Sequence, residues 1–128
     1  MTVAGTKHLD LDDSYVLQIR REPGRVTIEL EQCRHTGTKR LTVDVTGVTL
    51  EDASHFVGHN ITAPHPNPAS PLDYVQFAEQ RTGEVVLEGH LRNKPWYVWR
   101  LVATGVDIVD HDSAVSPPNN SLERTRER

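Results

Sequence analysis

The sequence alternates between apolar and polar residues with a period of two over most of its length. The pattern is clearest at 25–31, where Val26, Ile28 and Leu30 alternate with polar residues, and it returns at 41–46. Successive side chains of a β-strand point to opposite faces of a sheet, so this period indicates strands with one buried face. The alternation therefore predicts antiparallel sheet and leaves little room for helix.

Turn-forming residues separate the alternating segments. Pro23 and Gly24 predict a tight turn, because proline fixes φ and glycine accepts positive φ. Segments 15–20 and 25–33 should therefore form a hairpin, and Tyr15, Leu17 and Ile19 should share one face of its first strand. Further strands are expected at 40–46, 73–79, 84–91 and 96–109, the last broken at Gly105. No internal repeat is visible beyond this hairpin pattern.

Two parts of the chain do not follow the pattern. Residues 51–72 are expected to form an irregular, proline-rich loop, because four prolines stand between positions 63 and 71. Its first part, 51–57, could form one short helical turn. Residues 113–128 are expected to be a disordered tail, because the stretch 116–128 contains Leu122 as its one apolar residue. The prediction is one all-β domain over 1–112, an antiparallel β-sandwich or partly closed barrel of about seven to eight strands.

Composition excludes several classes of function. The net charge is −4 and the basic residues are scattered among acidic ones, which argues against a nucleic-acid partner. No apolar stretch is long enough for a membrane span or a signal peptide, so we expect a cytoplasmic protein that does not bind membranes. The single cysteine, Cys33, is interpreted as a small strand residue. The strand at 73–79 could be an exposed edge that pairs with its copy, so a structural or oligomerisation domain is a further alternative, and we expect a monomer or a weak homodimer.

Three histidines provide the one grouping that suggests a metal. His55 and His59 would share a face if their segment were helical, and His65 or Asp52 could then complete a zinc site. The intervening Phe-Val-Gly is a poor helix segment, so we interpret these histidines mainly as loop residues. A metal or small-ligand site in this loop remains the alternative.

No residue pattern predicts catalysis or a bound cofactor. Ser14, Ser54, Ser70 and Cys33 lack the glycine-flanked surroundings of a nucleophile elbow, and the glycines are too dispersed to cradle a phosphate. The sequence therefore predicts a protein that is not an enzyme.

One aromatic cluster could be core or binding surface. On a strand, Trp96 faces one side while Tyr97 and Trp99 share the other. A domain with few aromatic residues needs them inside, so we favour the core and keep a partner-binding patch that includes Trp99 as the alternative.

Four stretches of the chain, taken in order, are similar to the small bacterial immunity proteins of the immunity-protein-50 kind and related uncharacterised domains. These stretches cover about residues 9–109 and are Leu11-Asp-Asp-Ser-Tyr-Val-Leu-Gln-Ile19, Leu41-Thr-Val-Asp-Val-Thr-Gly-Val48, His59-Asn-Ile61, and Leu87-Glu-Gly-His-Leu91 followed by Val106-Asp-Ile108. The resemblance implies an all-β domain that binds and neutralises a cognate bacterial toxin without catalysis of its own. Residues Asp13, Ser14, Asn60 and Gly89 match the family motifs and suit structural roles.

A toxin-binding role would place contacts on loops, because loops vary and carry recognition on a rigid scaffold. We therefore expect the 51–72 region to contact the partner protein, with Asp52, His55 and His59 as candidates beside Trp99.

Overall fold

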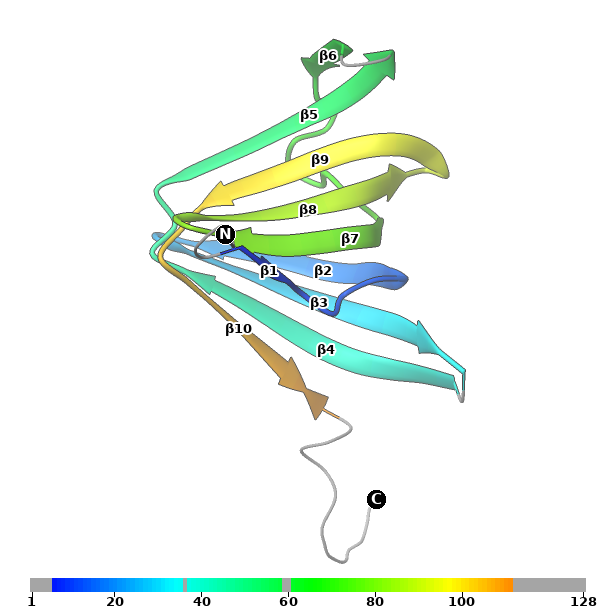
Figure 1. The fold of residues 1–128 in the computed structure, drawn as a ribbon, viewed down its shortest axis with the longest axis vertical. Coiled ribbons are helices and arrows are strands. Elements are labelled where there is room, and N and C mark those ends of the chain that lie inside the picture. The colour runs from blue at the N-terminus through cyan, green and yellow to red at the C-terminus, as the bar shows by residue number, and fades with distance from the viewer. Residues whose placement is uncertain (1–5, 36, 59–60, 112–128) are drawn as a thin grey trace, which may run out of the picture.

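A computed structural model gives the architecture of residues 6–35, 37–58 and 61–111, which form a single antiparallel sheet that does not close on itself (Figure 1). The described strands are β1 (Lys7–His8), β2 (Ser14–Glu22), β3 (Arg25–Arg34), β4 (Gly37–Thr46), β5 (Leu50–Gly58), β6 (Ile61–Pro64), β7 (Tyr74–Arg81), β8 (Glu84–Leu91), β9 (Lys94–Val102) and β10 (Gly105–Asp110). The predicted all-β class is confirmed, with ten strands in place of seven or eight. The described part of the chain holds no helix that is long and apolar enough to cross a membrane.

The order of the strands has an internal two-fold symmetry. It runs β10-β4-β3-β2-β7-β8-β9-β5-β6, with β1 beside β7. Strands β2, β3 and β4 correspond to β7, β8 and β9, and each set sends its next strand, β5 or β10, to the far edge of the other set. The symmetry extends to irregularities: register shifts occur between Val16 and Gln18 in β2 and between Val75 and Phe77 in β7. This repeat corrects the expectation that the chain holds none beyond the hairpin pattern.

The two sets of strands, which we call the first half (β2, β3, β4 and β10) and the second half (β7, β8, β9, β5 and β6), meet at β2 and β7. This contact is short, since only Ser14 pairs with Val75 and Tyr15 with Tyr74. At the end where the strands converge in Figure 1, the two crossing segments repeat one hydrogen bond: Thr49 N–H donates to Val102 O (2.9 Å) and Thr104 N–H to Thr46 O (3.0 Å). The pseudo-two-fold axis therefore passes between β2 and β7.

The inward faces of both halves share one core, so the sheet is curled. The alternation correctly predicts buried side chains at Val26, Ile28 and Leu30, all at most 3% exposed. The buried members of this core are Leu9, Leu11, Val26, Ile28, Leu30, Leu41, Val43, Val45, Leu72, Val75, Ala78, Val85, Leu87, Leu91, Tyr97, Trp99, Leu101 and Ala103. At about 25 cal/mol per Å² of buried apolar surface, such a core is the main stabilising term.

One polar network spans the curl. Arg21 of β2 donates to Glu51 of β5 through Nε (2.9 Å) and Nη2 (2.7 Å), although four strand spacings separate β2 from β5 in the sheet order. Glu51 Oε2 also accepts the Trp99 indole N–H at 2.9 Å. Arg21 Nη1 donates to the carbonyl oxygen of Ala69, 2.9 Å away in the proline-rich segment. Arg21 thus connects both halves and the proline-rich segment.

Four expectations about strands are corrected. Residues 51–57 belong to β5 and not to a helical turn, because Glu51 and His55 face inward onto Trp99 and Tyr97. Residues 61–64 form β6, which pairs with β5, so the irregular segment is shorter than the expected 51–72. The segment at 73–79 is not an edge, since β7 lies between β2 and β8. The register shift after Val16 leaves Tyr15 and Leu17 exposed while Ile19 packs on the core, so these three do not share a buried face. The expected tail at 113–128 lies outside the described residues.

Replacing Arg21 with methionine should lower the free energy of unfolding by about 1–3 kcal/mol, because Glu51 loses a charge-assisted partner and the loop carbonyl loses its donor. Urea denaturation measures this loss. Arg20→Met is the matched control: Arg20 is exposed, and its contact with Glu29 is 3.4 Å long. Exposed pairs contribute about 0–1 kcal/mol. If both variants lose the same free energy of unfolding, Arg21 does not hold the two halves together.

Candidate binding surface at the junction of the two halves

An uninterrupted row of aromatic rings crosses four adjacent strands on the outward face of the sheet. This aromatic row consists of Tyr15 (β2), Tyr74 (β7), His90 (β8) and Trp96 (β9). Neighbouring ring centroids lie 5.0 Å apart for Tyr15 and Tyr74, 5.6 Å for Tyr74 and His90, and 5.4 Å for His90 and Trp96. Tyr15 is 52% exposed and Trp96 41% exposed. Half the row therefore lies open to solvent.

The register of the paired strands brings the rings of the aromatic row side by side. Tyr15 is the register partner of Tyr74, and Tyr74 is the partner of His90. Between β7 and β8 the backbones approach closely at Gly89: a Cβ atom there would lie 2.0 Å from the Tyr74 carbonyl oxygen. Only glycine fits without a shift of the strand, so Gly89 keeps the two middle rings in line.

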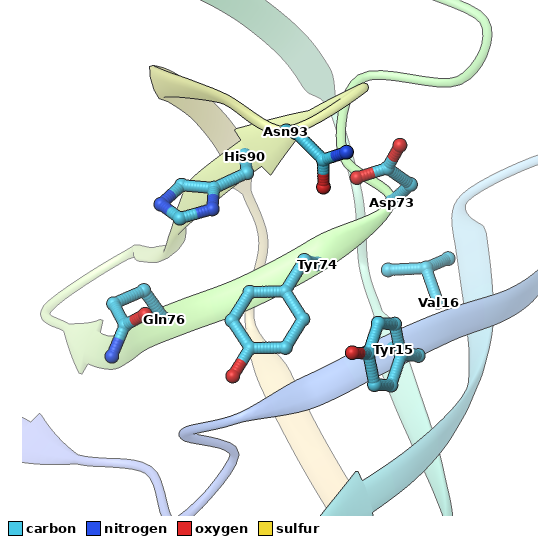
Figure 2. Close-up of a pocket in the computed structure, with 7 residues that line it drawn as sticks. All are labelled: Tyr15, Val16, Asp73, Tyr74, Gln76, His90 and Asn93. Carbon is cyan, nitrogen blue, oxygen red and sulfur yellow. The ribbon is translucent and has the colours of Figure 1, made fainter.

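The row lies beside a cavity of about 530 Å³, where β2 and β7 diverge after their short contact (Figure 2). Its lining residues come from β2, β7, β8 and the turns that flank them: Tyr15, Val16, Asp73, Tyr74, Gln76, His90 and Asn93. Asp73 is the only member of this set with a side chain of the Asp, Glu, Lys or Arg type. The cavity is therefore aromatic with a single carboxylate.

Asp73 is held by three hydrogen bonds. Its backbone N–H donates to His90 O (3.0 Å), and its carbonyl accepts from Val16 N–H (3.0 Å). Its Oδ2 accepts the Arg92 N–H at 2.7 Å. Arg92 and Asn93 have φ of 54° and 66°, the left-handed conformation of a two-residue hairpin turn, and this turn directs Asn93 toward the cavity. The carboxylate is thus pre-positioned before any ligand arrives.

Tyr74 is fixed by a second acid. Its hydroxyl donates to Asp13 Oδ1 at 2.8 Å, and Gln76 Nε2 donates to the same oxygen at 3.4 Å. Burial, together with the hydrogen bond to Asp13 and its charge, raises the pKa of Tyr74 to about 12. The fold therefore favours the neutral phenol.

On the outward face of the first half, ion pairs join β2, β3 and β4. Arg25 donates to both carboxylate oxygens of Asp44 at 2.7 Å, which lowers the pKa of Asp44. Arg20 contacts Glu29 in the same region. Paired charges of this kind describe a solvated face.

The structure separates the residues that the sequence analysis grouped. Trp99 is fully buried, so it offers no surface to a partner and that assignment is corrected. Its neighbour Trp96 is the exposed ring, and Tyr97 is buried, as the alternation predicts. Asp52 faces outward opposite Arg100, whereas the His55 ring faces inward and stacks on Tyr97 at 4.2 Å. His59 lies outside the described residues.

The proposed metal grouping does not assemble in the described part of the chain. His65 is 8% exposed, and both ring nitrogens are engaged: Nδ1 accepts the Asn67 N–H (2.8 Å), so Nε2 donates to Pro71 O (2.8 Å). No lone pair remains on that ring for a metal ion. Among the described residues no cluster of three His, Cys, Asp or Glu side chains has metal-binding geometry.

The sequence analysis did not identify Tyr15, Tyr74 or His90. A signal was present, since Tyr15-Val16 and Tyr74-Val75 stand at the same distance before Gly24 and Gly83, in the two turns that the symmetry relates. Comparison of the chain with protein-family models, with curated proteins and with solved structures finds no match in any of the three.

The raised pKa of Tyr74 can be measured through the ultraviolet absorbance of tyrosinate. One of the three tyrosines should titrate with a midpoint near 12, and Tyr74→Phe should remove that phase. Asp13→Asn should lower the midpoint, because it removes the charge that disfavours tyrosinate while burial remains. The contribution of neutral Tyr74 to the free energy of unfolding should be fully present below about pH 10, the pKa of a tyrosine in the unfolded chain. It should be lost as the pH rises through about 12, the pKa of Tyr74 in the folded protein. Midpoints near 10 for all three tyrosines would contradict this geometry.

Proposed function

We propose that the protein is a non-enzymatic binding module that recognises a protein partner through the aromatic row. The observation that supports this most strongly is the exposure of Tyr15 and Trp96 at the two ends of a contiguous row of rings. Tyrosine and tryptophan dominate the energetic centres of protein interfaces, because each buries a large area at a small cost in side-chain entropy.

The position of the row adds to this argument. All four rings stand on strands, and hydrogen-bonded register fixes the middle of the row. A surface that is ordered before binding loses little conformational freedom on association. Rings that only stabilised the fold would be expected in the core, where Tyr97 and Trp99 lie.

Within this proposal, the resemblance to bacterial immunity proteins suggests the partner. The protein would bind and neutralise a cognate toxin in the cytoplasm, acting as a monomer or weak homodimer, with no catalytic step and no cofactor. Its net charge of −4 favours a basic toxin, because complementary charge accelerates encounter.

Co-expression with the product of the adjacent gene tests this function. Growth rescue and co-elution are expected, and Tyr15→Ala and Trp96→Ala should each weaken the complex about tenfold or more, as loss of a central interface ring does. Leu50→Ala is the matched control, since Leu50 is as exposed (51%) and faces outward at the opposite end of β5.

Two results would count against the proposal. A complex that Asp52→Asn or His55→Ala weakens, and that Tyr15→Ala leaves unchanged, would move the interface to β5 and the proline-rich segment. If co-expression gives no growth rescue and no co-elution, the toxin is excluded as the partner.

A further inference from the structure

The cavity beside the aromatic row has chemistry that selects one kind of group. The rings of Tyr15, Tyr74 and His90 border it, and Asp73 contributes its one carboxylate. Figure 2 shows these rings and the Asp73 side chain around the same opening. Aromatic faces carry a negative quadrupole and attract cations, and the carboxylate adds a full negative charge. The cavity is therefore suited to a positively charged group with apolar faces.

Asp73 retains the capacity to bind such a group. Its Oδ2 accepts the backbone N–H of Arg92, and within the described ranges its Oδ1 accepts no hydrogen bond. A carboxylate offers about four lone-pair sites, so donors from a ligand can be accepted at both oxygens. The side-chain carbonyl oxygens of Gln76 and Asn93 are further acceptors at the rim.

We propose that this cavity binds the guanidinium group of an arginine side chain presented by the protein partner. This inference rests on the proposed function, because the arginine would belong to that partner. A guanidinium is planar and weakly hydrated, so it stacks on tyrosine and histidine faces while its edge donates to a carboxylate. A lysine ammonium has no flat face to stack and holds its water more strongly. An anionic ligand would meet the charge of Asp73.

Small probes test the cavity without the partner. In an NMR titration of the whole protein, N-acetyl-arginine methylamide should shift the ring signals of Tyr15, Tyr74 and His90 and saturate in the millimolar range, the affinity expected of one side chain. The citrulline analogue has the same shape without the charge and should bind about tenfold more weakly, or not at all. The lysine analogue should bind several-fold more weakly than the arginine analogue.

Substitutions of the lining residues test whether the arginine analogue binds in this cavity. Asp73→Asn removes the charge but keeps an oxygen for the Arg92 N–H, so the turn is retained, and arginine affinity should fall about tenfold. Tyr15→Ala removes an exposed ring and should reduce it several-fold without loss of the fold. Glu22→Gln removes the same charge at the exposed far end of β2 and should leave the arginine affinity unchanged.

The inference is overturned if the arginine and citrulline analogues bind equally, or if no saturable shift occurs. It is also overturned if a neutral oligosaccharide shifts the same rings and arginine does not. If the adjacent-gene complex forms and depends on Tyr15 and Trp96, but Asp73→Asn leaves its affinity unchanged, the arginine inference fails while the proposed function stands.

Discussion

The contact between β2 and β7 joins the two halves of the sheet and is two residue pairs long. The position of the aromatic row and of the cavity beside it depends on this contact. Ser14 pairs with Val75 and Tyr15 with Tyr74, and beyond these pairs the strands diverge. Because the contact lies on the pseudo-two-fold axis, it brings two equivalent tyrosines side by side on the outward face. The same divergence opens the cavity that Asp73 borders. A longer pairing between β2 and β7 would close that cavity.

The inward face is stabilised because the curled sheet brings the apolar side chains of both halves into contact. Apolar side chains from both halves share one core, and Arg21 joins Glu51 across it while Glu51 accepts the Trp99 indole N–H. Removing one partner of such a network leaves the others without their hydrogen bonds, which costs more than an exposed ion pair contributes. The core and this network hold the strands on which the aromatic row depends.

Alternation in the sequence predicted the sheet and the buried faces of β3 and β4, because a half-buried strand places apolar residues at every second position. It could not locate the bulges, and the extra residue in β2 moved Tyr15 from the expected buried set to the outward face. The local pattern does not show that segment 51–57 is a strand, since its pairing with β9 is a tertiary contact distant in sequence. The repeat escaped detection because equivalent positions share apolar character and seldom identity, as with Val43 and Trp99.

The proposed binding function rests on the outward face, where the aromatic row lies beside one fixed carboxylate, that of Asp73. The central claim is that a partner binds across the junction of the halves. Hydrogen–deuterium exchange of the protein, alone and with the adjacent-gene product, measures this most directly. The account predicts slower exchange on binding at 13–18, 73–77 and 88–97. Protection confined to 51–58 and 61–72, with no change at the junction, would contradict it.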